Sequence, residues 1–215
     1  MAMEGINWGA VNTQVIQLNE YFSTLKNELN KLDFTFADEL AGAWASGNAI
    51  KFGNTLRDED KEVVSSVSNS WAIVSSYIKN AANTYAENFN VPNSISIPGF
   101  LSSSGAGMPE GAFFKETLNG TTGMNKEIVK NLLLDYKKTV NNLLDDFKAN
   151  VSSIEIAIFD AANAQKEAFR FAVLDLENKI KVKVISMGTI LTSLIESEID
   201  NVEIAKSRTV STFNS

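Results

Sequence analysis

The chain has 215 residues, 44% of them hydrophobic and 21% charged, which is typical of globular proteins and provides enough apolar residues for a core. It contains neither Cys nor His, so disulfides, thiolate chemistry and imidazole bases or ligands are excluded. A net charge of −7, from 19 basic and 26 acidic residues, disfavours binding to nucleic-acid phosphates.

Residues 1–89 are predicted to form one helical hairpin. In its first helix, apolar residues recur at steps of three and four, the spacing that keeps one helix face against a partner. They are Val11, Val15, Leu18, Phe22, Leu25, Leu29, Leu32, Phe36 and Leu40. Residues 44–48 contain Gly, Ser and Asn and predict a reversal. A second stripe follows, with Phe52, Leu56, Val63, Val67, Trp71, Val74, Ile78, Ala82 and Tyr85.

Within the second stripe, the run Arg57-Asp58-Glu59-Asp60-Lys61-Glu62 leaves one turn without an apolar residue. Mixed charges on a helix usually face solvent. We therefore interpret residues 57–62 as a solvated helix face.

Residues 90–123 are predicted to be a linker. All three prolines of the chain lie here, together with a Gly- and Ser-rich stretch at 102–107, and this composition favours loops over helices. The apolar residues within it indicate that it packs along part of its length; they are Ile95, Ile97, Phe100, Phe113 and Phe114.

Residues 124–215 are predicted to form a second hairpin, with a softer break at 159–163. Its first stripe contains Val129, Leu133, Tyr136, Val140, Leu144, Phe147, Val151, Ile154 and Ile158. Its second contains Phe169, Val173, Leu176, Ile180, Val184, Met187, Leu191, Leu194 and Val202. The expected fold is all-α: two long antiparallel helical hairpins packed as an intramolecular four-helix bundle. Because this pairing is internal, we expect a monomer.

The two halves resemble each other. A shift of 115 residues places Tyr21 on Tyr136 and Trp44 on Phe159, and a two-residue insertion then places Phe52 on Phe169. This alignment predicts a tandem repeat in which Phe159 and Ala162 form the second turn. Three aromatic residues, Trp71, Tyr21 and Tyr136, are candidate packing anchors.

The first turn resembles that of a known family. Leu40 to Ala49, with Trp44 followed by Gly47, and then Phe52, resembles the turn of the WXG-motif family, the ESAT-6-like proteins of type VII secretion in actinobacteria and Firmicutes. The resemblance covers residues 6–89 and, more weakly, 126–207. This chain has Trp-x-x-Gly where the family has Trp-x-Gly. The family's export signal is a Tyr followed four residues later by an acidic residue, and this chain lacks it. A partner would then supply the signal.

The resemblance implies a noncatalytic protein, made in the bacterial cytoplasm and secreted without a cleaved signal peptide. Its partner would be the secretion machinery or a co-secreted helical protein, bound through helix faces. It would act as an exported substrate or as the partner and chaperone of a larger effector. The family implies no cofactor, and the residues themselves show no catalytic constellation and no metal-binding pattern, because without His the scattered acids and serines lack a base or a co-ligand.

A membrane-acting, pore-forming-like helical effector is the alternative. The segment Val182 to Ile195 is the most apolar window, but it is interrupted by Lys, Ser and Thr and is too short to span a bilayer. The acidic net charge also argues against binding to anionic lipids. Residues 1–5 lack the basic and apolar regions of a secretory signal, so we expect no such signal.

Overall fold

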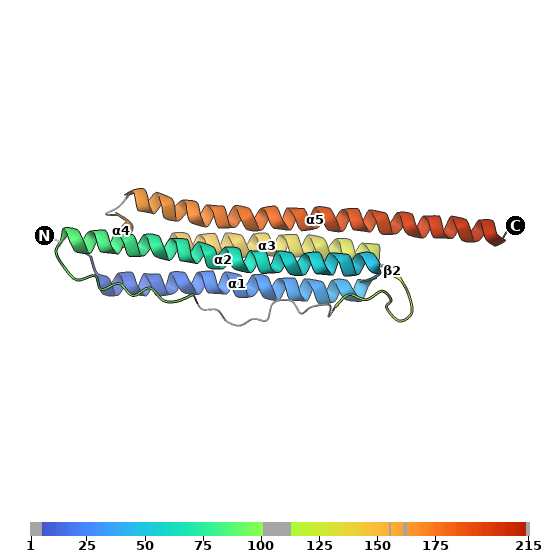
Figure 1. Ribbon diagram of the computed structural model, residues 1–215, viewed down its shortest axis with the longest axis horizontal. Helices are drawn as coiled ribbons and strands as arrows, with labels where there is room; N and C mark the ends of the chain where they lie inside the picture. The colour runs from blue at the N-terminus through green and yellow to red at the C-terminus, as the bar shows by residue number, and fades with distance from the viewer. Residues whose placement is uncertain (1–5, 101–112, 155, 161–162, 214–215) are drawn as a thin grey trace. The chain divides into compact units, whose positions relative to one another are not determined.

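The computed structural model describes residues 6–100, 113–154, 156–160 and 163–213 and confirms the predicted all-α class (Figure 1). The elements are α1 (Trp8–Ala43), β1 (Trp44–Ala45), α2 (Gly47–Asn88), β2 (Gly123–Met124), α3 (Lys126–Ser153), α4 (Ala157–Asp160) and α5 (Asn163–Phe213). The chain divides into two compact units, and each unit contains segments of α1, α2, α3 and α5.

Unit 1 comprises Met1–Leu29, Val63–Gly105 and Asn141–Ile180. Its core is organised around Phe22 of α1, whose ring centroid lies 5.6 Å from that of Trp71 of α2 and 5.0 Å from that of Phe147 of α3. On α3, Lys148 forms an ion pair with Glu177 of α5 at 3.5 Å. These contacts join all four helical segments, as a bundle requires.

Unit 2 comprises Asn30–Glu62, Ala106–Val140 and Lys181–Ser215. Phe36 of α1 stacks on Tyr136 of α3 at 4.5 Å and meets Phe52 of α2 edge-on at 6.4 Å. The amide of Asn48, at the start of α2, donates a hydrogen bond of 2.8 Å to Glu198 of α5. This unit is therefore also a bundle of four helical segments. The predicted division into domains 1–89, 90–123 and 124–215 follows the sequence and stays a prediction.

The apolar stripes identify most of the core, but some of their residues are only half-buried, among them Tyr85 of α2 and Phe169 of α5. Leu32 was expected in the core, yet it is only half-buried, and Asp33 occupies the buried position with 3% exposure. On α5, Ile195 is buried in place of Leu194. A step of three residues and a step of four residues both return the chain to nearly the same helix face. Spacing alone therefore does not decide which of two adjacent residues is buried.

The third helix ends earlier than its stripe predicted. The stripe continued through Ile154 and Ile158, but α3 ends at Ser153 and Ile158 lies in the separate helix α4. The Ser153 hydroxyl donates a hydrogen bond of 2.6 Å to the carbonyl of Asn150.

The described part of the linker is not helical, and residues 94–100 follow α1 within unit 1. Asn12 donates to the carbonyl of Ser94 and accepts from the N–H of Ser96, at 3.1 and 2.8 Å. One heptad further, Asn19 donates to the carbonyl of Gly99 at 3.0 Å. Side chains seven residues apart lie on one line of a helix, so α1 binds this extended segment along a polar row.

The later part of the linker leads into β2 through a tight turn. Leu118 and Thr121 exchange backbone hydrogen bonds of 2.8 and 2.9 Å. Between them, Asn119 and Gly120 both have positive φ, as the Asn-Gly turn of a hairpin requires. The Gly- and Ser-rich stretch of the linker lies outside the described residues, as does the predicted turn residue Ala162.

Candidate functional site

The motif turn is held by Trp44, which is fully buried in unit 2. Its ring lies 6.2 Å from that of Phe52 at an angle of 35°. The backbone of β1 pairs antiparallel with β2, placing Trp44 opposite Met124, and the N–H of Asn125 donates to the carbonyl of Ala43 at 2.8 Å. The turn after α1 therefore also anchors the segment that begins α3.

Gly47 lies where the motif turn leads into the next helix. It is the first residue of α2, it is exposed, its φ is not positive, and a Cβ there would have no heavy atom within 4 Å. The residue that shapes this turn is Ser46, whose Oγ accepts a hydrogen bond of 3.2 Å from the N–H of Ala49. This is an N-cap, and Ser directly before a helix was the signal that could have revealed it.

A different glycine, Gly53, is required by packing. A Cβ at Gly53 would lie 2.2 Å from Cδ2 of Phe114, because the Phe114 ring packs directly against α2 at this position. The same ring meets Phe52 edge-on at 6.5 Å. The absence of a side chain at Gly53 therefore allows Phe114 of the linker to pack against α2 in unit 2.

These two glycines form a matched pair for a substitution test. Gly47→Ala should leave the free energy of unfolding unchanged or raise it by up to about 1 kcal/mol, because Ala is the better helix former. Gly53→Ala should lower it by roughly 1–3 kcal/mol through overpacking against Phe114. Urea unfolding followed by circular dichroism measures both. Equal effects of the two substitutions would show that Phe114 does not pack on Gly53.

The second turn, in unit 1, carries a related aromatic pair. Phe159 of α4 is buried, with 3% exposure, and its ring lies 5.4 Å from that of Phe169 at an angle of 30°. The repeat alignment places Phe159 on Trp44 and Phe169 on Phe52. Both turns thus pair an aromatic residue with one from the following helix at similar distance and tilt, as a repeat would predict.

The three candidate packing anchors lie in different surroundings. Trp71 is 3% exposed and packs on Phe22 in unit 1. Tyr21 is half-buried and lines a shallow hollow of about 190 Å³ beside Phe147. Tyr136 is buried in unit 2, where its ring stacks on Phe36.

A buried polar cluster in unit 2 was missed by the sequence analysis. The hydroxyl of Tyr136 donates a hydrogen bond of 2.6 Å to Oδ1 of Asp33, and the charge of Asp60 on α2 acts on the pKa of Asp33. Asp33 and Asp60 are only 3% and 2% exposed. The interpretation of residues 57–62 as a solvated face is therefore wrong at Asp60, which occupies the core position between Leu56 and Val63.

Burial raises the pKa of the Asp33 carboxyl well above its ordinary value of 3.8, and the adjacent Asp60 raises it further. The hydrogen bond from Tyr136 acts in the opposite direction, because it stabilises the carboxylate. Burial and the negative charge of Asp33 also raise the pKa of the Tyr136 hydroxyl. Burial in unit 2 therefore disfavours the ionised form of Asp33 relative to that of an exposed aspartate.

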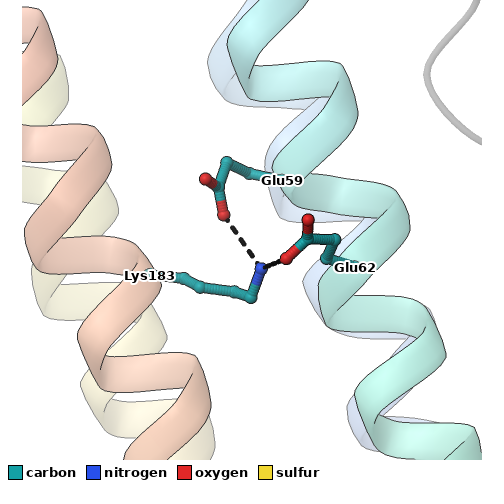
Figure 2. Close-up of polar contacts among 3 residues, drawn as sticks. All are labelled: Glu59, Glu62 and Lys183. Carbon is teal, nitrogen blue, oxygen red and sulfur yellow. Dashed lines mark hydrogen bonds and ion pairs between the residues drawn. The ribbon is translucent and has the colours of Figure 1, made fainter.

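Beside this cluster, Lys183 of α5 binds two acids of α2 (Figure 2). Its Nζ lies 3.1 Å from Glu59 and also contacts Glu62. Partial burial disfavours the ammonium, but the hydrogen bonds to Glu62 and Glu59 outweigh it and raise the pKa of Lys183. These contacts tie α5 to α2 within unit 2.

Unit 1 contains a larger hollow, of about 560 Å³, between the end of α3 and the start of α5. Its apolar lining includes Phe159 and Phe169, and its charged residues are Lys148, Lys166, Arg170 and Glu177. Within the described ranges, no group of three or more acidic side chains is placed to hold a metal ion.

Comparison of the chain with known protein families, curated proteins and solved structures gave no match. Among the helical segments that the structure describes, none combines the length and the apolar character needed to cross a membrane.

Proposed function

We propose that this chain is a noncatalytic, protein-binding helical bundle of the WXG type that acts in type VII secretion. It serves as an exported substrate or as the partner and chaperone of a larger secreted effector. The resemblance of Leu40 to Ala49 to the family turn supports this proposal. Trp44 is buried in the core beside the turn. Its role is therefore structural and requires no bound substrate.

The observation that carries the protein-binding role is the outward face of α5. One side of this helix is buried, with Val173, Leu176, Ile180, Val184, Met187, Leu191 and Ile195. Within unit 2, the opposite side of this helix carries Val182 and Ile185, which are each 65% exposed. Apolar side chains so exposed along one face are typical of a surface that binds another protein. The partner would offer an amphipathic helix with a complementary apolar face.

The similar aromatic pairs of the two turns support a tandem repeat, in which the second hairpin replaces the partner subunit of a dimer. The protein is then a monomer in solution. Light scattering coupled to gel filtration tests this directly, and a stable dimer would contradict internal pairing.

The surface of α5 can be tested with a matched pair of variants. A photo-crosslinking amino acid at Thr189, an exposed position of α5 one turn after Ile185, should trap a protein partner in the producing cell. The double substitution Val182→Glu and Ile185→Glu should abolish the crosslink, because it places charges on the apolar face. Ser186→Glu adds a charge at an exposed polar position of the same helix and should preserve it. Loss of the crosslink in both variants, or in neither, would contradict recognition through this face.

The same exposed residues support the membrane-acting alternative, because Val182 and Ile185 begin the apolar segment 182–195. Vesicles of phosphatidylcholine and phosphatidylglycerol loaded with a fluorescent dye separate the two functions. A membrane effector releases the dye, whereas a protein-binding bundle leaves the vesicles intact.

A further inference from the structure

The hollow of unit 1 is large enough to hold a small molecule. Its volume is about 560 Å³. Ligand pockets in proteins usually measure roughly 300–1,000 Å³. The described residues that line the hollow all lie in the segment Asn141–Ile180 of unit 1. The hollow is therefore a feature of one unit.

Apolar side chains from three helices form the wall of the hollow. Val151 belongs to α3, Phe159 to α4 and Val173 to α5, and they are 3%, 3% and 9% exposed. The ring of Phe169, also on α5, lies 5.4 Å from that of Phe159. Apolar side chains beside an open space lack contacts that close packing would provide. An apolar ligand that fills the hollow would supply these contacts.

The lining follows α5 over several turns. On this helix it extends from Lys166 to Glu177. Eleven steps along a helix, at about 1.5 Å each, correspond to about 16 Å. An extended alkyl chain of medium length matches this shape better than a compact ring system does.

The charges around the hollow favour an anionic ligand. Its described lining residues include three bases, Lys148, Lys166 and Arg170, and one acid, Glu177, although the whole chain has a net charge of −7. Glu177 is 7% exposed and forms an ion pair with Lys148 at 3.5 Å, so a basic residue of the same wall offsets its charge. Lys166 and Arg170 lie one turn apart at the other end of the α5 lining, where they would attract a carboxylate.

Arg170 is well suited to bind a carboxylate, because its planar guanidinium donates two parallel hydrogen bonds to such a group. In the structure it forms an ion pair of 3.0 Å with Glu167, and the two side chains are 61% and 58% exposed. Exposed pairs of this kind contribute little to stability. Replacing Glu167 by the carboxylate of a ligand therefore costs little.

We propose that the hollow of unit 1 binds a single-chain amphiphilic carboxylate, a fatty acid of medium length. The alkyl chain lies against Val151, Phe159 and Val173, and the carboxylate lies beside Lys166 and Arg170. This site uses residues other than those of the proposed protein-binding face in unit 2, and it does not depend on the secretion role.

Isothermal titration calorimetry of the intact protein with dodecanoate, below its micelle concentration, measures this binding. We expect saturable binding of one dodecanoate per chain. Dodecyltrimethylammonium has the same alkyl chain with a positive headgroup and should bind at least about tenfold more weakly, because its headgroup would lie beside like charges. No binding of dodecanoate, or equal affinity for the two amphiphiles, would overturn the proposal.

Ser152 and Ser153 provide a matched pair of variants that tests the location of the site. Both are exposed near the end of α3, and of the two, Ser152 lines the hollow. Ser152→Phe should fill part of the hollow and abolish measurable binding of dodecanoate, whereas Ser153→Phe should keep the wild-type affinity. Far-ultraviolet circular dichroism verifies that both variants are folded. Equal affinities of the two variants would overturn the proposal.

A second pair tests the position of the carboxylate. Arg170→Gln should weaken dodecanoate binding at least about threefold, because it removes the charged donor of the site. Lys179→Gln removes a positive charge from a 55% exposed side chain of the same helix, outside the lining of the hollow, and should preserve the affinity. Equal effects of the two substitutions would contradict a carboxylate bound beside Arg170.

Discussion

Trp44→Ala should lower the free energy of unfolding by roughly 3–5 kcal/mol, the usual cost of removing a large aromatic side chain from a core. Trp44 is fully buried and packs on Phe52, so the truncation leaves a cavity at the junction of α1, α2 and β2. Urea unfolding monitored by far-ultraviolet circular dichroism measures the change.

The matched variant for this prediction is Trp44→Phe, because the second turn already uses Phe159 at the corresponding position. Among the described residues, the buried indole N–H of Trp44 has no hydrogen-bond partner, so Phe removes an unsatisfied donor while keeping an aromatic ring. We expect Trp44→Phe to cost clearly less than Trp44→Ala. Equal losses would show that the turn requires the indole itself.

Trp71→Ala should have a comparable effect in unit 1, again roughly 3–5 kcal/mol. Trp71 is 3% exposed and packs on Phe22, which in turn contacts Phe147 of α3. Its loss should therefore weaken the contact between three helices. The same unfolding measurement applies.

Ile73→Ala serves as the control for this second prediction. Ile73 lies two residues away on the same helix and is 44% exposed, so its truncation should cost well under 1 kcal/mol. If Ile73→Ala were as destabilising as Trp71→Ala, α2 would present a different face to the core.

The helical architecture could be predicted from the sequence because apolar spacing repeats over long segments. Phe22, Phe52 and Leu144 lie in the core where their stripes placed them. The polar core positions could not be found in the same way. Asp33 interrupts the stripe beside Leu32, and Asp60 lies in a charge run, so both resembled solvent-facing residues.

Contacts between residues that are far apart in the sequence could not be predicted either. The docking of Phe114 on Gly53 and the row of linker contacts on α1 join residues more than sixty positions apart. At the motif turn, Gly47 matches the glycine of the family pattern, whereas Ser46 provides the helix cap. A serine directly before a helix indicates an N-cap from the sequence alone, and Gly47, which belongs to the family pattern, is the residue after it.

Export is the measurement that tests the proposed function most directly. The protein is quantified in the culture medium of producing cells with and without their type VII secretion ATPase, with a cytosolic marker to control for lysis. We predict that it reaches the medium only when the ATPase is present. Equal amounts in the medium under both conditions would contradict type VII secretion, and retention in the cells under both would contradict an exported substrate and leave only the chaperone role.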